Sequence, residues 1–129
     1  KRVLVIEDGP TVTHGGMAFG AGTVAAERHG AITVDPRPYA VGTIRDTFEA
    51  NPHLERVLPA MGYSEEQRTA LAVTINACCA AEEVSCVLDA SPARLDRMMH
   101  LDVPLVRVAY RFVQLDGPPL EERVLRLLD

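Results

Sequence analysis

Features that mark several protein classes are missing from this 129-residue sequence. It has no apolar stretch near the ~18 residues that a membrane-spanning helix needs, and its first residues lack the order of a signal peptide. It also has no run of Lys or Arg, and its formal net charge is −5. Since nucleic-acid binding rests largely on basic patches, nucleic acid is a poor candidate partner. We therefore expect a cytoplasmic protein that binds neither membranes nor nucleic acid.

Motifs for metal binding and nucleophilic catalysis are also missing. Cys78, Cys79 and Cys86 form neither an even disulfide set nor a Cys-x-x-Cys pair, so we expect them to be reduced and mostly buried. The histidines are scattered without zinc-ligand spacing. Ser64 and Ser91 do not lie in a Gly-x-Ser-x-Gly elbow and are better explained as helix N-caps. We assign no metal ligand and no serine nucleophile.

Strand-like and helix-like segments alternate along the chain. At 47% hydrophobic and 24% charged residues, the composition is that of a folded globular domain. The alternation favours a three-layer α/β fold, in which helices cover both faces of a mostly parallel, Rossmann-like sheet. The patterns predict strands at residues 3–6, 31–34, 57–58, 84–88 and 105–113, and helices at 17–29, 43–50, 64–81, 92–99 and from 119 onward.

Unusual loops follow the first four predicted strands, at residues 8–16, 35–39, 59–63 and 89–92. Ligands of open parallel sheets bind beyond the carboxyl ends of the strands, so we expect these loops to share one edge. The first loop offers glycines, two hydroxyl groups and an imidazole just before a predicted helix start, which favours phosphate or carboxylate. It matches neither a Walker A loop nor Gly-x-Gly-x-x-Gly. The alternative is a tight turn without a ligand.

Individual side chains in these loops have a chemical and a structural interpretation. His14 is a candidate general acid or base, or a donor to a phosphoryl oxygen; the alternative is an imidazole that only hydrogen-bonds its loop. Arg37, between two prolines, suits a bidentate anion clamp or a structural ion pair with Asp35 or Asp8. The two aspartates could hold Mg²⁺ through water or cap their loops. We predict His14 as catalytic and the following as ligand-binding: Asp8, Gly9, Thr11, Thr13, Gly15, Gly16, Asp35, Arg37, Gly62 and Ser91.

Three motifs occur in the same order as in a known family. Residues 2–17 with Gly20-Ala21-Gly22, residues 34–38 and residues 58–63 together resemble the predicted-GTPase family that includes cyclic 2,3-diphosphoglycerate synthetase. The resemblance extends to about residue 112. It implies nucleoside-triphosphate chemistry with ATP or GTP and Mg²⁺ as cofactors, since that synthetase uses ATP to close a phosphoanhydride ring in 2,3-diphosphoglycerate. It also implies that residues 1–129 are a single domain at the C-terminal end of a longer multidomain chain, with the P-loop upstream.

One position departs from the family pattern. Where the family has Gly-Thr-Pro-x-Asp-Leu after the fourth strand, this chain has Ala90 to Leu95, and Arg94 replaces the acid. An acid that touches a nucleotide base or a metal in relatives would have its charge inverted here, so the resemblance does not fix nucleotide specificity.

Two functions remain open. The first is a phosphate-binding domain of a nucleotide-dependent synthetase or GTPase, which holds a small phosphorylated ligand together with upstream domains of the same chain and turns over little alone. The second is a non-catalytic interaction or dimerisation module, in which the proline-rich loops and methionines form an interface, including one in a homodimer. A dehydrogenase domain is disfavoured because the dinucleotide-binding glycine pattern is missing.

Overall fold

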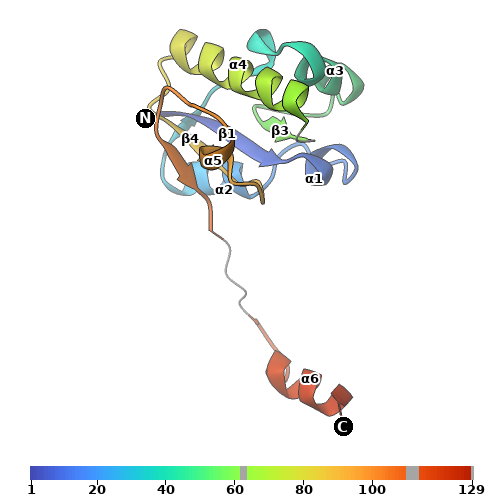
Figure 1. Ribbon diagram of the computed structural model, residues 1–129. Coiled ribbons are helices and arrows are strands. Elements are labelled where there is room, and N and C mark those ends of the chain that lie inside the picture. Colours follow the sequence, from blue (N-terminus) through green and yellow to red (C-terminus); the bar gives the residue numbers. More distant parts are fainter. Residues whose placement is uncertain (62–63, 110–113, 129) are drawn as a thin grey trace.

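The computed structural model describes residues 1–61, 64–109 and 114–128 and contains a five-stranded sheet in which every pairing is parallel (Figure 1). The strand order is β2-β1-β4-β5, and β3 also pairs with β1. The elements are β1 (Arg2–Asp8), α1 (Gly9–Thr13), α2 (Ala21–Arg28), β2 (Ile32–Thr33), η1 (Arg37–Tyr39), α3 (Gly42–Ala50), β3 (Leu58–Ala60), α4 (Glu65–Ala81), β4 (Cys86–Asp89), α5 (Leu95–Met98), β5 (Leu105–Arg107) and α6 (Leu120–Leu128).

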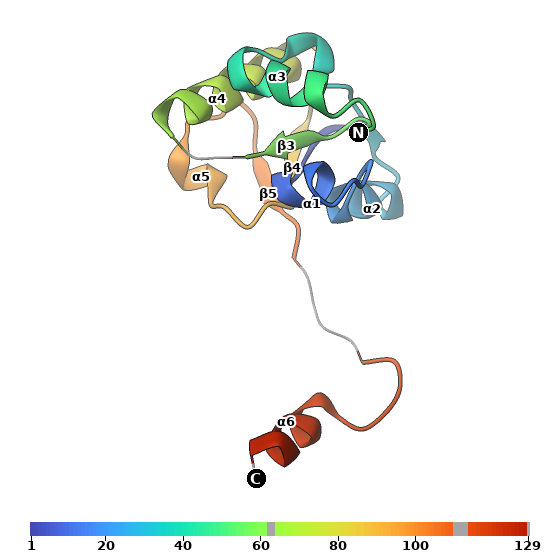
Figure 2. The same ribbon diagram turned by 90° about the vertical axis from the view of Figure 1, so that its right-hand side faces the viewer.

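The central strand β1 is buried on both faces. Leu4 and Ile6 pack in one apolar cluster with residues of α3 and α4, whereas Val3 and Val5 pack in a second cluster with Ala26 of α2. Helices therefore lie on both sides of the sheet (Figure 1, Figure 2). This arrangement confirms the predicted three-layer α/β fold and explains the continuous β-branched run, because a strand covered on both faces has no polar side.

The strands β2 and β3 lie one after the other along the same edge of β1. β2 pairs with Arg2 and Val3, whereas β3 pairs with Ile6 to Asp8. The loop after β2 therefore leaves the sheet near the start of β1, far short of its carboxyl end. The expectation that all four loops share one edge is wrong for residues 35–39. The physical reason is that Pro36 and Pro38 end the strand early, and β3 takes the remaining edge of β1.

Several predicted boundaries shift in the structure. The segment predicted as a loop after β1 begins with the short helix α1, and the following helix begins at Ala21 instead of residue 17. The strand predicted at 105–113 is described only as Leu105–Arg107, and residues 110–113 lie outside the described part of the chain. The capping box at Ser64 and Gln67 and the end of α4 at Ala81 are confirmed.

The cysteines and the helix lengths also agree with the sequence analysis. All three cysteines are free; Cys78 and Cys79 are buried and Cys86 is half-buried. In the described segments, no helix combines the length and the apolar composition needed to cross a bilayer.

Candidate functional site

The loop after β1 is braced by its own side chains. Thr11 Oγ1 donates to Asp8 Oδ2 at 2.8 Å, and Thr13 Oγ1 donates to the Gly9 carbonyl at 2.8 Å. A Cβ on Gly9 would lie 2.4 Å from the Ala60 carbonyl oxygen, so this glycine allows α1 to pack on β3. These residues thus form a short helix with local side-chain bonds, and ligand binding by them stays a prediction.

His14 is the side chain of this loop that is most available for chemistry. It is exposed at the C-terminal end of α1, and it has no hydrogen-bond or ion-pair partner among the described residues. With Thr13 it lines a shallow depression of about 300 Å³. The other residues around the depression come from α3 and from the ends of α3 and β3: Asp46, Thr47, Ala50, Asn51 and Met61.

The imidazole of His53 holds α1 in place. Its Nε2 lies 2.6 Å from the Val12 carbonyl oxygen, which joins α1 to the connection between α3 and β3. Val12 itself is fully buried. This contact fixes the wall from which His14 projects, and sequence patterns gave no reason to single out His53.

A buried carboxylate that the sequence analysis missed lies at the end of β1. Glu7 is 2% exposed and accepts backbone N–H groups of Gly20 at 2.5 Å, Gly22 at 2.9 Å and Thr23 at 3.3 Å. These are the donors at the start of α2, where a helix favours negative charge. Burial raises the pKa of Glu7 above its ordinary value, while the N–H groups of Gly22, Thr23 and Gly20 oppose that rise. The anion at this helix start is thus the chain's own carboxylate.

The glycines that flank this carboxylate are required by close packing. A Cβ on Gly22 would lie 2.6 Å from Val5 Cγ1 and 2.9 Å from Glu7 Oε1. We expect Gly22→Ala to lower the free energy of unfolding by about 1–3 kcal/mol, because an added methyl overpacks a buried contact. Urea denaturation followed by circular dichroism measures the change. Glu27→Ala, an exposed position on α2, is the matched control; equal midpoints for both variants would contradict the packing argument.

Two side chains of the loop after β2 form an ion pair with each other. Arg37 Nε and Nη2 each donate to one oxygen of Asp35 at 2.8 Å, and this contact lowers the pKa of Asp35. Tyr39 donates to Glu82 at the end of α4, and Glu82 also binds Arg2 at the start of β1. The loop therefore runs toward the amino ends of the strands. No hydrogen bond or ion pair between described residues joins it to His14, and the two do not line the same depression.

The end of β4 carries a second buried acid. Asp89 is fully buried; Ser91 donates to its Oδ1 through N at 2.9 Å and Oγ at 2.6 Å, and Arg107 Nη1 lies 3.3 Å from its Oδ2. Arg107 also donates to the Ala93 and Ser91 carbonyls. Burial raises the pKa of Asp89, and the hydrogen bonds from Ser91 and the charge of Arg107 oppose the rise.

This arrangement corrects the predicted helix at 92–99. Ser91 is not its N-cap, because Asp89 engages its hydroxyl and its N–H, and α5 begins only at Leu95. Arg94, which replaces the acid of the family pattern, forms an exposed ion pair with Asp96. Neither Asp89 nor Arg107 was singled out from the sequence, although an acid that ends an apolar strand was a usable signal.

Gly62, another predicted ligand-binding residue, lies outside the described part of the chain. Within residues 1–61, 64–109 and 114–128, no group of three His, Cys, Asp or Glu side chains is placed to hold a metal ion. The two aspartates considered for Mg²⁺ are engaged separately, Asp8 by Thr11 and Asp35 by Arg37. The two carboxylates thus have different partners in different loops, and a Mg²⁺ role for them stays a prediction.

Comparison with known proteins shows that the chain is similar to a protein named as a synthetase. It is 50% identical over 123 residues, 95% of its length, to a protein from Thermococcus kodakarensis (strain ATCC BAA-918 / JCM 12380 / KOD1) named arginine synthetase ArcE. The chain is similar to part of a synthetase. It spans 27% of that relative's length. No protein-family model and no solved structure matches the chain.

Proposed function

We propose that this chain is the domain of a synthetase that holds a small anionic substrate at the loop after β1. The proposal rests on the imidazole of His14, which is exposed and has no hydrogen-bond or ion-pair partner among the described residues. It lines the same depression as Thr13 and Asn51. In parallel sheets this edge is where ligands are held. The 50% identity to a synthetase supports a role in that class of enzyme.

The side chains around the depression define what the ligand must offer. His14 can donate to a phosphate or carboxylate oxygen, or exchange a proton with it. Asp46 also lines the depression and can accept a hydrogen bond from a hydroxyl or amino group. Our proposed ligand therefore places an anionic group near His14. Binding of this kind contributes positioning, on which phosphoryl and acyl transfer depend.

Two features of this domain favour a nucleoside-triphosphate site elsewhere in a longer enzyme. The chain has no Walker A loop, and Glu7 already fills the start of α2. We place ATP or GTP with Mg²⁺ in other domains of a longer enzyme. The reaction implied by the resemblance to cyclic 2,3-diphosphoglycerate synthetase belongs to those domains as well. The chain's 27% share of the synthetase relative is compatible with that division.

Calorimetry tests the proposal directly. We expect the chain to bind 2,3-diphosphoglycerate more tightly than ATP or GTP, and His14→Ala to weaken that binding about tenfold, or ~1.4 kcal/mol, because one charge-assisted hydrogen bond is lost. His100→Ala, which removes an exposed histidine paired with Asp102, is the control and should bind normally. No heat with any of the three ligands, together with an unchanged His14→Ala titration, would reject the proposal.

A non-catalytic interaction module is the second candidate. Met17 and Phe19 are exposed directly after the loop that carries His14, and exposed apolar side chains often mark contact surfaces. Light scattering with and without phosphate separates the two functions. A stable dimer whose mass and thermal midpoint do not change with phosphate favours the interaction module. A monomer whose thermal midpoint rises with phosphate favours the anion site.

A further inference from the structure

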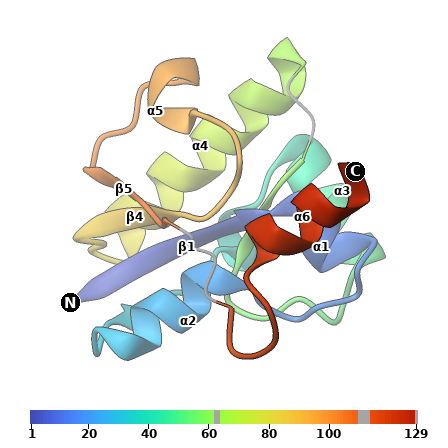
Figure 3. The same ribbon diagram turned by 90° about the horizontal axis from the view of Figure 1, so that it is seen from below.

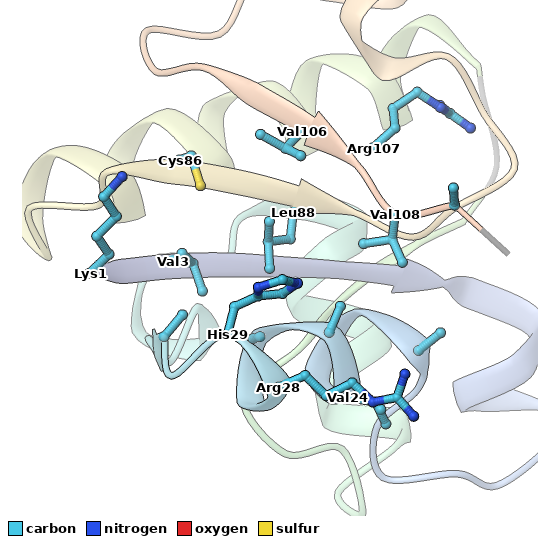
Figure 4. A pocket seen from close by; sticks show the side chains of 15 residues that line it. Lys1, Val3, Val24, Arg28, His29, Cys86, Leu88, Val106, Arg107 and Val108 are labelled. Atoms are coloured by element: carbon cyan, nitrogen blue, oxygen red, sulfur yellow. The ribbon is translucent and has the colours of Figure 1, made fainter.

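A second hollow of about 750 Å³ lies on the sheet face that carries α2. Its floor consists of Val3, Leu88 and Val106 from three neighbouring strands, and Val24 of α2 forms a wall (Figure 4). We refer to this hollow as the α2 groove. Three basic side chains line it as well: Lys1, Arg28 and His29. Arg107 also borders the groove, but its guanidinium points away from it toward Asp89 (Figure 4). The groove is thus apolar at its floor and basic around it.

The α2 groove exists because this face of the sheet is covered only in part. Among the described elements, α2 packs along β1 on this face, and most of β4 and β5 has no helix over it (Figure 3). Val106 of β5 is consequently 50% exposed. The opposite face carries both α3 and α4, so a helix beside α2 would complete the same two-helix layer.

One helix of the chain, α6, leaves its apolar face exposed within the part that the structure describes. Leu120, Val124 and Leu128 of α6 fall on one face at helical spacing, Leu125 and Leu127 flank them, and all five are exposed. The opposite face carries the ion pair between Glu122 and Arg126 at 3.0 Å. α6 lies apart from the sheet in both side views (Figure 1, Figure 2).

We propose that α6 docks into the α2 groove of its own chain. The nine residues of α6 are ~13 Å long, about the length of the four-residue strand β4 that the helix would cover. The ten residues between Ala109 and Leu120 can span roughly 35 Å, which suffices to return from the end of β5 to the groove. A short tether also gives α6 a high effective concentration there.

Charge complementarity supports the same occupant. Glu121 follows Leu120 by one residue and lies at the margin of the apolar face, between Leu125 and Leu128 on the helix surface. It has no ion-pair partner within the residues that the structure describes. Docking of α6 would bring this carboxylate to the basic side chains around the groove, which include Lys1 and Arg28. Glu121 therefore lies on the side of α6 that would face the basic side chains of the groove.

Disulfide trapping tests this docking with a thiol that the groove already contains. Cys86 lines the groove, whereas Cys78 and Cys79 are buried, which raises their thiol pKa to about 12 and about 11. We expect Val124→Cys, at the centre of the apolar face, to form an intramolecular disulfide with Cys86 under mild oxidation. Arg126→Cys, two residues on and on the opposite face, should react several-fold less.

The controls make each outcome decisive. Cys86→Ala combined with Val124→Cys should abolish the monomeric cross-link, and a peptide map of the Val124→Cys variant should show Cys86 bonded to the introduced thiol. Equal yields from the Val124 and Arg126 variants, or no cross-link with intact folding by circular dichroism, would overturn the proposal. Cross-linking only between chains, seen as a disulfide dimer, would also overturn it, because the occupant would then be a second copy.

Discussion

Replacing Glu7 with alanine lowers the free energy of unfolding by about 3–5 kcal/mol. The substitution removes the acceptor of three backbone N–H groups at the start of α2, and each buried donor without an acceptor costs about 1–3 kcal/mol. Urea denaturation of the wild type and the variant gives the difference. Glu49→Ala, an exposed glutamate on α3, is the control and should change stability by less than ~0.5 kcal/mol.

The conservative variant Glu7→Gln keeps the shape of the side chain and isolates the charge. Burial raises the folded-state pKa of Glu7 above 4.5, so the folded chain binds this proton more tightly than the unfolded chain does. Its contribution to stability therefore falls as pH rises from about 4.5 through the folded-state pKa. We expect Glu7→Gln to remove that fall. A wild-type and a Glu7→Gln profile with the same slope across this window would contradict the assigned role, as would a Glu7→Ala variant as stable as the control.

Replacing Arg107 with alanine lowers the free energy of unfolding by about 2–3 kcal/mol. Removing one partner of a buried ion pair typically costs about 3–5 kcal/mol, and the value here is at or below the lower end because the Arg107 side chain is 35% exposed while Asp89 is fully buried. Asp89 keeps only its bonds from Ser91 in this variant. Arg94→Ala, which breaks the exposed pair with Asp96, should leave the unfolding midpoint nearly unchanged.

The pH dependence of the Arg107→Ala variant separates the ion pair from packing. Without the guanidinium, the pKa of Asp89 rises further above 3.8, so the destabilisation should be larger at pH 7 than at pH 4. An equal loss at both pH values would assign the effect to lost packing of the arginine stem. The double variant with Asp89→Asn should lose less than the sum of the two single variants, since both remove the same pair.

Local patterns in the sequence predicted much of the fold. The run of four β-branched and leucine residues at 3–6 predicted a strand buried on both faces, and β1 is such a strand. Ser64 with Gln67 predicted the start of α4, and the reciprocal hydrogen bonds of a capping box are present there. These predictions succeeded because their causes lie within a few residues of each other.

The candidate site depended on long-range geometry that no local pattern contains. Grouping Arg37 with His14 assumed that β2 extends as far as β1, but two residues of pairing end β2 near Val3. Glu7 follows the predicted strand at 3–6 and was given no role, because its partners are thirteen to sixteen positions away in the chain. Ser91 fitted an N-cap by spacing, and the buried Asp89 engages it instead. Competition among tertiary partners decided each of these positions.

A titration of the isotope-labelled chain with 2,3-diphosphoglycerate, followed by amide resonances, tests the proposed anion site most directly. We predict concentration-dependent shifts at Thr11, Thr13, His14, Gly15 and Gly16, with the amides of Cys86 and Val106 in the α2 groove unmoved. The same titration of His14→Ala should show those shifts only at higher ligand concentrations. Shifts confined to the α2 groove or to the Asp35–Arg37 loop, or none at saturating ligand, would contradict the account.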